Sequence, residues 1–372
     1  MRVGLLPALG GSLSELATTG QVARLINGYL RPYVASFDGV TYFSYRPERL
    51  ESFTTDAVIL ERVRVLSPAR EMFRGWRALT MPFIHAADFR LCAVLRVFQI
   101  TGVIPAILIR ARFGIPFVTA YGFQYERLAR SRTRGLLRGI VARLGLRAAA
   151  AVIVPTAEFW DLVASRVGAA KVHLVPNGVD VRRFSPGAGP ADARPALLYV
   201  GRLSAEKSLG TLLGAASKLL ARFDVGVVLV GEGHERAALE AQAQALGAPV
   251  EFVPFVDHRE LPRLYARARA FVLPSLTEGH PKVLLEAMAC GVPCVASSVG
   301  GSRAILADGD TGLLFEAGDV GGLAACLERV LTQPETARRL GERGRAAVVE
   351  RYDLERLVAG EIALLRGVAA AV

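Results

Sequence analysis

The chain has 372 residues, 52% of them hydrophobic, and is therefore long enough to bury two cores of ordinary domain size. No stretch reaches the roughly 18 to 20 uncharged apolar residues that a membrane-spanning helix requires, and the N-terminal apolar run ends at Pro7, so we expect no span, no signal peptide and a cytoplasmic location. Residues 1–190 carry 25 Arg and Lys against 12 Asp and Glu, whereas the remainder carries 20 against 22, so the positive charge belongs to the first half and by itself predicts no partner.

The first half alternates apolar runs with helical patterns. Strands are predicted at residues 3–8, 40–45, 57–60, 92–99, 117–121 and 151–155. Residues 176–195 then lack periodicity and are rich in Gly and Pro, which is typical of a hinge. We therefore predict a domain boundary near Pro186–Pro190, with one domain at 1–186 and a second at 187–351.

The second half repeats the same alternation more clearly. Strands are predicted at residues 197–203, 225–233, 250–255, 270–275 and 293–298, each followed by a helical pattern. Strands separated by 10 to 15 helical residues indicate a parallel sheet covered on both faces. The predicted fold is α/β, with two Rossmann-like doubly wound domains and a ligand site at the carboxyl ends of the strands.

The strongest candidate site is the segment 274–297. Pro281 suits the first position of a helix, so Glu278 would lie in the loop before that helix and Glu286 one to two turns inside it. Backbone amides near Gly279–Lys282 would form a positive helix end suited to an anion. Carboxylates accept paired hydrogen bonds from neighbouring hydroxyls, which is the chemistry of sugar binding.

The second candidate is the segment 200–209. Arg202 follows a buried-type strand, and Lys207 is placed in the first helical turn, where a cation is unfavourable unless an anion is bound. Together the two cations can neutralise a diphosphate. The alternative is a surface ion pair between Arg202 and Glu206.

Two glycine turns follow predicted strands, Gly10–Gly11 and the segment 230–235 with Gly231, Glu232 and Gly233. Such turns permit close approach of a ligand, but they also occur as ordinary strand-to-helix turns, and both interpretations stay open. The four cysteines are scattered without a second ligand pair, which predicts neither zinc nor a disulfide.

Residues 127–147 hold seven arginines and no acidic residue. The leucines between them partly follow helical spacing, so a basic face, with Arg130, Arg132, Arg134 and Arg138 on it, suits anionic lipid headgroups. A solvated helix face is the alternative. Nucleic acid is not expected, because no aromatic interleaving or known binding motif accompanies the charge.

The ordered motifs VPNGVD (175–180), VGRL…EK (200–207), VGEG (230–233), PS…EG.P…LEAMA.G.PV-like (274–295) and DG.TGLLF (308–315) resemble the retaining glycosyltransferases of family four, which have the GT-B fold. The resemblance implies that Arg202 and Lys207 contact the donor diphosphate, that Glu278 holds donor-sugar hydroxyls and that Glu286 binds the ribose. It also places Gly10 and Gly11 near the donor phosphates, requires no metal, and predicts that a last helix at about 352–372 crosses back to the first domain. Further donor-binding candidates within these motifs are Gly231, Glu232, Gly279, His280, Pro281, Lys282 and Val283.

The resemblance implies a hexosyl-type glycosyltransferase without cofactor or metal, which moves a sugar from a nucleotide-diphosphate donor to a sugar or lipid-linked acceptor with retention of configuration, in polysaccharide or glycolipid synthesis. It could lie peripherally on the inner face of the cell membrane. One departure is Tyr121 before Gly122, where many members carry His-Gly. The alternatives are a sugar-nucleotide epimerase or phosphorylase on the same fold, and a non-catalytic membrane-docking partner of a polysaccharide assembly machine.

Overall fold

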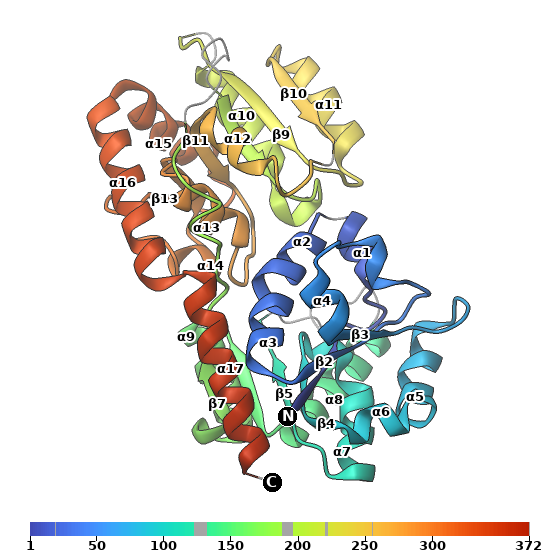
Figure 1. Cartoon of the computed structure of the whole chain (residues 1–372). Helices are drawn as coiled ribbons and strands as arrows, with labels where there is room; N and C mark the ends of the chain where they lie inside the picture. The colour runs from blue at the N-terminus through green and yellow to red at the C-terminus, as the bar shows by residue number, and fades with distance from the viewer. Residues whose placement is uncertain (19, 123–131, 188–195, 220–221, 255, 372) are drawn as a thin grey trace. The chain divides into compact units, whose positions relative to one another are not determined.

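The computed structural model describes residues 1–18, 20–122, 132–187, 196–219, 222–254 and 256–371. These residues form two compact units (Figure 1). The first holds Met1–Pro176 together with Glu355–Val372, and the second holds Asn177–Leu354. The first unit thus ends earlier than the boundary near Pro186 predicted from composition. Among the helices of the described ranges, none is long and apolar enough to cross a membrane.

The first unit is built on a seven-stranded sheet in the order β3-β2-β1-β4-β5-β6-β7, with parallel pairing throughout. Its strands are β1 (Arg2–Leu6), β2 (Gly39–Phe43), β3 (Val63–Leu66), β4 (Cys92–Val97), β5 (Phe117–Ala120), β6 (Ala151–Val154) and β7 (Val172–Leu174). Its helices are α1 (Leu13–Thr18), α2 (Val22–Leu25), α3 (Arg31–Ser36), α4 (Ala57–Arg62), α5 (Arg74–Ile84), α6 (Ala86–Arg90), α7 (Val103–Phe113), α8 (Arg132–Ala148), α9 (Ala157–Val167) and α17 (Leu354–Ala370).

One strand prediction in this unit is wrong. Residues 57–60 belong to the helix α4, because the Asp56 carboxylate accepts hydrogen bonds from the amides of Val58 and Ile59 at 3.0 and 3.2 Å and so caps a helix N-terminus. The strand of this region, β3, begins only at Val63. A four-residue apolar run does not by itself distinguish a strand from a helix, and the cap decides the outcome.

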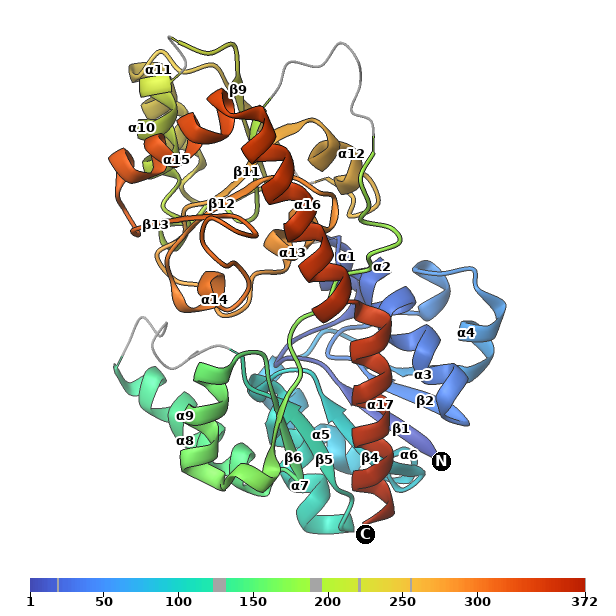
Figure 2. The ribbon, with the colours of Figure 1, turned by 90° about the vertical axis from the view of Figure 1, so that its left-hand side faces the viewer.

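The last helix, α17, packs on the first unit although it follows the whole second unit in sequence (Figure 2). Glu361 of α17 accepts two hydrogen bonds from the buried guanidinium of Arg96 on β4, at 2.7 and 3.0 Å, and one from the hydroxyl of Tyr33 on α3. Because Arg96 and Glu361 are both about 5% exposed, this ion pair lies in the interior of the unit. It ties the C-terminal helix to a central strand.

The second unit has a six-stranded parallel sheet in the order β10-β9-β8-β11-β12-β13. Its strands are β8 (Ala196–Val200), β9 (Gly226–Val230), β10 (Val250–Val253), β11 (Ala268–Leu273), β12 (Cys294–Ser297) and β13 (Leu313–Phe315). Its helices are α10 (Leu209–Leu219), α11 (Arg236–Ala245), α12 (Leu261–Ala266), α13 (Lys282–Ala289), α14 (Gly300–Arg303), α15 (Val320–Thr332) and α16 (Pro334–Arg351). The two parallel sheets confirm the predicted α/β fold of two Rossmann-like domains.

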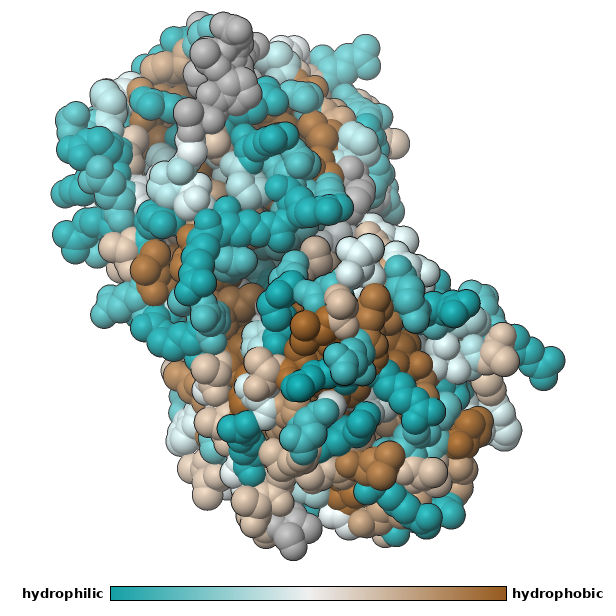
Figure 3. Space-filling model, viewed as in Figure 1, coloured by the Kyte–Doolittle hydropathy of each residue, from teal (hydrophilic) through white to brown (hydrophobic). Residues whose placement is uncertain are grey.

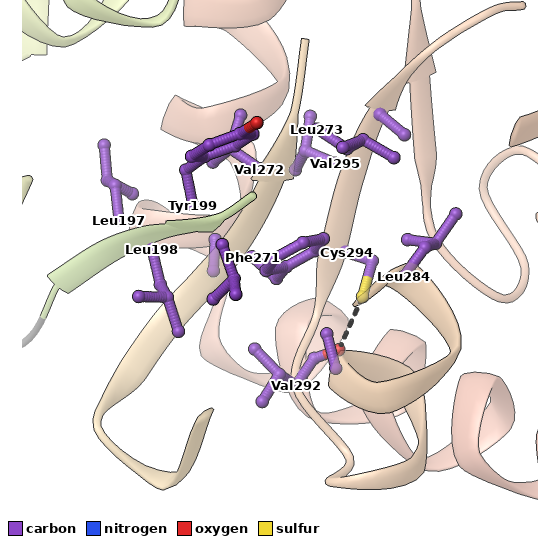
Figure 4. Packing of buried hydrophobic residues seen from close by; sticks show 14 of the residues in the cluster. Leu197, Leu198, Tyr199, Phe271, Val272, Leu273, Leu284, Val292, Cys294 and Val295 are labelled. Atoms are coloured by element: carbon purple, nitrogen blue, oxygen red, sulfur yellow. Dashed lines mark hydrogen bonds between the residues drawn. The ribbon is translucent and has the colours of Figure 1, made fainter. Parts of the chain in front are cut away.

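The core of the second unit is centred on β8 and its neighbour β11. Leu198 of β8 pairs in register with Phe271 of β11, whereas Leu197 points to the opposite face of β8 (Figure 4). All three side chains are at most 2% exposed. Strands buried on both faces read as continuous apolar runs, which is why these strands were predictable from sequence. A rigid central pair of strands is the support for the loops that follow β8 and β11.

Candidate active site

The chain of the second unit reverses direction across its sheet between β8 and β11. From β8 it proceeds to β9 and β10 on one side, and then returns to β11 on the other side of β8. In open parallel sheets, ligands bind at the carboxyl ends of the strands beside such a switch point. The loops after β8 and β11, which hold the strongest sequence candidates, therefore meet where this fold places its ligands.

An ion pair joins these two loops. Nζ of Lys207, at the end of a short 3₁₀ turn after β8, lies 2.6 Å from Oε1 of Glu278, in the loop after β11. The two side chains are 16% and 10% exposed. The same carboxylate oxygen accepts a hydrogen bond from the hydroxyl of Ser275 at 2.7 Å. The predicted cation and the predicted carboxylate are thus brought together.

The backbone holds Lys207 in place at some cost. Lys207 was predicted in the first turn of a helix, but it ends the 3₁₀ turn Ala205–Lys207, and α10 begins only at Leu209. Ser208 between them has φ 48°, in the left-handed region that residues other than glycine rarely adopt. Strained backbone of this kind persists where the surroundings determine it and is concentrated at functional sites.

A glycine that was not among the sequence candidates packs against the loop that carries Glu278. A Cβ built on Gly301, in α14, would lie 2.6 Å from the carbonyl oxygen of Glu278. Only glycine permits this approach without moving the loop. The pair Gly300–Gly301 at the start of α14 is the feature of the sequence that could have indicated this contact, because glycine permits close approach of another backbone.

Arg202 is at the surface of the same region. Its side chain is 77% exposed, and its guanidinium lies 3.2 Å from the carboxylate of Glu206, which is the surface pair considered as the alternative. The hydroxyl of Tyr199 donates to the carbonyl oxygen of Arg202 at 2.8 Å. Burial and the nearby charge of Glu278 raise the pKa of Tyr199, so this hydroxyl stays protonated and keeps the loop attached to β8.

Glu286 lies apart from the Lys207–Glu278 pair, in a buried cluster of its own. It is on α13, within the first two turns as predicted, but it is only 3% exposed. One carboxylate oxygen lies 3.0 Å from Nε2 of His258, and the other accepts a hydrogen bond from the hydroxyl of Tyr265 at 3.2 Å. Burial, followed by the charge of Glu286, raises the pKa of Tyr265 well above its usual range. Both protein partners of Glu286 were missed because they lie 28 and 21 residues away in sequence.

The turn Gly279–Val283 connects the Lys207–Glu278 pair to the buried cluster around Glu286. Pro281 is the N-cap of α13 rather than its first residue, since the helix begins at Lys282. The carbonyl oxygen of His280 accepts a hydrogen bond from Asn177 at 2.8 Å, and its ring lies 5.4 Å from that of Tyr352. Burial, helped by the charge of Lys282, lowers the pKa of His280 to about 3, so the ring is neutral near pH 7.

Each glycine of the turn after β9 packs against the loop that leads to Lys207. A Cβ on Gly231 would lie 2.0 Å from the carbonyl oxygen of Gly201, and a Cβ on Gly233 would lie 2.0 Å from that of Leu203. The exposed Glu232 pairs with Arg236 at 3.3 Å. The close approach that these glycines permit is therefore made by the neighbouring backbone.

The remaining candidates belong to the first unit. Gly10, with φ 90°, and Gly11 form the turn after β1, and the amide of Gly11 donates to the carbonyl oxygen of Ala8 at 2.8 Å. Arg130 lies outside the described residues, as do the side chains of Arg132 and Arg134 on α8. Arg138, farther along α8, is exposed. Within the described ranges, no group of three or more His, Cys, Asp or Glu side chains is arranged to hold a metal ion.

Two family models match consecutive parts of the chain. Residues 40–183 match the model described as Glycosyltransferase Family 4, and residues 181–347 match the model described as Glycosyl transferases group 1. Together they extend over most of the first unit and nearly all of the second.

Curated relatives match about half of the chain. The D-inositol 3-phosphate glycosyltransferase of Frankia alni is 40% identical over 200 residues, which cover 48% of this chain and 49% of the relative. The glycogen synthase of Mycobacterium tuberculosis is 36% identical over 195 residues, which cover 50% of this chain and 46% of the relative. The chain thus spans about half the length of the curated relatives it matches.

Solved structures match the whole chain. Sucrose-phosphate synthase from Thermosynechococcus elongatus has a TM-score of 0.82 at 24% identity, with 100% of both chains covered. The Anabaena protein HepE in complex with UDP has a TM-score of 0.79 at 19% identity, with 99% of this chain and 100% of HepE covered. At these identities the likeness shows the fold, and with the two consecutive family matches it confirms the resemblance noted in the sequence: the chain belongs to family four of the glycosyltransferases, with the GT-B fold.

Proposed function

We propose that this protein transfers a sugar from a nucleotide-diphosphate donor to a hydroxyl group of a sugar or lipid-linked acceptor, with retention of anomeric configuration. The observation that carries the proposal is the Lys207–Glu278 pair, because it places an ammonium and a carboxylate side by side at the switch point of the second sheet. A diphosphate needs the cation, and the hydroxyls of a sugar need the carboxylate.

The carboxylate of Glu278 is prepared to bind hydroxyls. The hydrogen bonds from Lys207 and Ser275 both end on Oε1 and fix the orientation of the group. Oε2 is then the oxygen that accepts hydrogen bonds from the donor sugar. A charge-assisted hydrogen bond of this kind is stronger than one between neutral groups. The residue that pairs with Lys207 would therefore also set the orientation of the sugar relative to the diphosphate.

Arg202 is the second cation of the proposed site. In the structure it pairs with Glu206 at the surface, and exposed pairs of this kind contribute only about 0 to 1 kcal/mol. Exchange of Glu206 for a diphosphate therefore costs little, whereas the planar guanidinium can bind phosphate oxygens through two parallel hydrogen bonds. We propose that Arg202 turns to the donor when the donor binds.

The proposed chemistry is a substitution on one face of the sugar. The bond from the anomeric carbon to the diphosphate oxygen breaks, the bond to the acceptor oxygen forms on the same face, and the acceptor proton passes to an oxygen of the leaving diphosphate. Lys207 and Arg202 stabilise the negative charge that grows on the leaving group. Fixed cations aimed at developing charge are among the largest contributions an enzyme makes. We propose that neither a metal ion nor an enzyme nucleophile takes part.

Glu286 can bind a ribose only if its present hydrogen bonds change. The resemblance assigns it to the ribose, yet both of its oxygens are held by His258 and Tyr265 at 3% exposure. We propose that it binds ribose hydroxyls after one of these hydrogen bonds opens. Glu286→Gln should then weaken the binding of UDP itself, whereas Glu278→Gln should weaken the binding of the UDP-sugar and leave that of UDP within about twofold.

The first test is a thermal-shift screen against UDP-, GDP- and ADP-sugars. UDP-sugars come first because the structural neighbour HepE was solved with UDP. A donor at 100 times its Kd stabilises the folded protein by about 2.7 kcal/mol, whereas a non-catalytic docking partner should show no such effect. The product of turnover with an acceptor distinguishes transfer from epimerisation, since an epimerase converts the donor without any acceptor.

The second test removes the two cations. Lys207→Ala and Arg202→Ala should each lower kcat/KM by about 10² to 10³, equivalent to about 2.7 to 4 kcal/mol. Lys218→Ala is the matched control, since Lys218 is an exposed cation on α10 away from the loops of the site. If both variants turned over at rates within twofold of the Lys218→Ala protein, the role of the cations would be refuted.

The cellular role is proposed in the same terms. A cytoplasmic location, work in cell-surface polysaccharide or glycolipid synthesis, and attachment of the basic segment 127–147 to the inner face of the membrane all remain predictions from the sequence. Deletion of the gene, followed by analysis of the cell-surface glycans and glycolipids, would identify the product class that disappears.

A further inference from the structure

Helix α5 of the first unit exposes several large apolar side chains and buries one of its arginines, Arg77. Phe73 at its N-cap, Trp76 and Phe83 are 77%, 61% and 57% exposed, and Leu79 and Ile84 are also exposed. These residues recur at helical spacing and form one stripe on the outer face of the helix. Contiguous exposed apolar surface of this kind is unusual on a soluble protein and marks an interaction site.

The inner face of α5 shows that this orientation is held by the fold. Arg77 is 1% exposed, and its guanidinium donates to the carbonyl oxygen of Ser44 at 3.4 Å and contacts Nε2 of His85 at 3.0 Å. Ala78 and Met81 are buried beside it. Turning the helix to hide its aromatic side chains would break the hydrogen bonds of a buried cation, so the exposed stripe is a stable feature of the surface.

The helices next to α5 add positive charge to the same layer. Helix α7 packs against both α5 and α8, and Arg112 of α7 lies over the ring of Phe83, 4.9 Å from its centroid. Arg110 of α7 and Arg143 of α8 are exposed, and α8 also exposes apolar side chains, among them Leu137. The sequences of α5, α7 and α8 contain no acidic residue.

Apolar residues, brown in Figure 3, gather among hydrophilic ones over the part of the view that holds the first unit. We define the outer α5–α7–α8 face as the exposed apolar side chains of α5 and α8 with the exposed arginines of α7 and α8.

The charge of this face selects its occupant. A second copy of the chain would bring arginines against arginines in a symmetric contact, without one acid on the three helices to compensate them. A protein interface would also be expected to match these cations with carboxylates of its own. An anionic bilayer offers both required components at once, because phosphates attract the arginines and the acyl boundary accepts the aromatic side chains.

We propose that the outer α5–α7–α8 face binds the surface of an anionic lipid bilayer, with Trp76 and Phe83 inserted at the headgroup boundary and the arginines of α7 and α8 on lipid phosphates. This surface extends beyond the basic segment predicted from sequence, because α5 supplies the apolar side chains that insert. Aromatic residues with one polar edge, such as tryptophan, favour this boundary.

The test uses the full chain and vesicles of phosphatidylcholine with or without phosphatidylglycerol. The parent protein should sediment with the anionic vesicles, and its tryptophan emission should shift to the blue as Trp76 leaves water. Trp76→Ser/Phe83→Ser should bind these vesicles at least about tenfold more weakly, since two largely exposed side chains lose their transfer into the bilayer. Neutral vesicles should also bind the parent at least about tenfold more weakly.

The matched control is Leu246→Ser/Val349→Ser, which removes two exposed apolar side chains from the second unit. It should bind like the parent, and all variants should keep the melting temperature of the parent. Absence of vesicle binding, equal binding of the Trp76→Ser/Phe83→Ser variant, or equal binding to neutral vesicles would each overturn the proposal. Sedimentation velocity tests the remaining alternative, a second copy of the chain. If the parent were a dimer and Trp76→Ser/Phe83→Ser a monomer, the face would be a dimer interface and the proposal would be overturned.

Discussion

Replacing Glu361 by glutamine should destabilise the first unit severely. The change removes the anionic partner of Arg96, a residue that is 4% exposed and whose guanidinium donates two hydrogen bonds to the Glu361 carboxylate of α17. Burial alone disfavours the charged guanidinium, but the Glu361 carboxylate outweighs it and raises the pKa of Arg96 above its usual value. Because the guanidinium of arginine is not deprotonated in proteins, Arg96 stays charged in the variant, now without this compensation.

The magnitude follows from this geometry. Breaking a buried ion pair by removing one partner costs about 3 to 5 kcal/mol, because the other charge is left without a counter-charge in the interior. For a unit of this size each kcal/mol lowers the melting temperature by about 2 to 4 °C, so the first unit of Glu361→Gln should melt about 6 to 20 °C below the parent. Arg96→Met/Glu361→Leu, which removes both charges, should recover most of this loss.

Intrinsic fluorescence makes the measurement specific to one unit. The chain has two tryptophans, Trp76 and Trp160, and both belong to the first unit, so the emission during heating or urea unfolding reports that unit alone. Glu51→Gln, in the same unit, is the control, since Glu51 is 64% exposed and its contact with Arg49 is 4.0 Å long. It should change the free energy of unfolding by less than about 0.5 kcal/mol.

If Glu361→Gln lowered the free energy of unfolding by less than about 1 kcal/mol, the reasoning would be refuted, because a buried guanidinium without a counter-charge should destabilise the unit by more than that. A double variant no more stable than Glu361→Gln would refute it differently. The loss would then come from the packing of α17 and not from the unpaired charge.

Three further predictions concern single positions. The unfolding free energy of the second unit should fall as pH drops from about 6.5 towards 3, by up to about 1.4 kcal/mol per pH unit. The reason is that unfolding returns the pKa of His280 to its ordinary value, so in this pH range the unfolded chain binds a proton that the folded chain does not. His280→Phe should flatten this slope in circular dichroism melts. Gly233→Ala should cost about 1 to 3 kcal/mol, since its Cβ would lie 2.0 Å from a backbone oxygen, whereas Gly360→Ala, with open space around it in α17, should stabilise its unit by about 0.5 to 1 kcal/mol. Ser208→Val should be about 1 to 2 kcal/mol less stable than Ser208→Gly, because a β-branched residue tolerates φ 48° poorly.

Each of these has a clear contrary result. An unchanged acid slope in His280→Phe would assign the pH dependence to other groups. Equal melting temperatures for Gly233→Ala and the parent would show that the loop after β8 yields without strain. A Ser208→Val protein as stable as Ser208→Gly would mean that the left-handed conformation at this position is not required.

The sequence by itself determined the fold class and most of the strands. Runs such as 197–200 and 270–273 are apolar on both faces, which only a buried parallel strand needs, and their position between helical patterns predicts the doubly wound order. Residues 57–60 form an equally short apolar run, but the Asp56 cap begins a helix there, so the strand prediction is wrong. Local capping can outweigh β-propensity where the apolar run has only four residues.

For the candidate site, the sequence supplied the residue types and the tertiary structure decided their partners. The order of the motifs identified Arg202, Lys207, Glu278 and Glu286 as candidates. Their positions in the sequence do not specify which carboxylate pairs with which cation. Contacts between loops of different strands depend on strand order, which places β8 beside β11 and so joins Lys207 to Glu278. Arg202 instead pairs with Glu206, four residues along the same loop, which is the local pair considered from the sequence.

Partners far apart in the chain were beyond prediction for the same reason. The pairing of Arg96 with Glu361 spans 265 residues, and no local pattern on either segment specifies the other. Each side chain reads in isolation as an ordinary charge on a strand or an amphipathic helix. Only the packing of α17 on the first sheet brings them into one dry environment, where the physical need of a buried charge for a counter-charge makes them a pair.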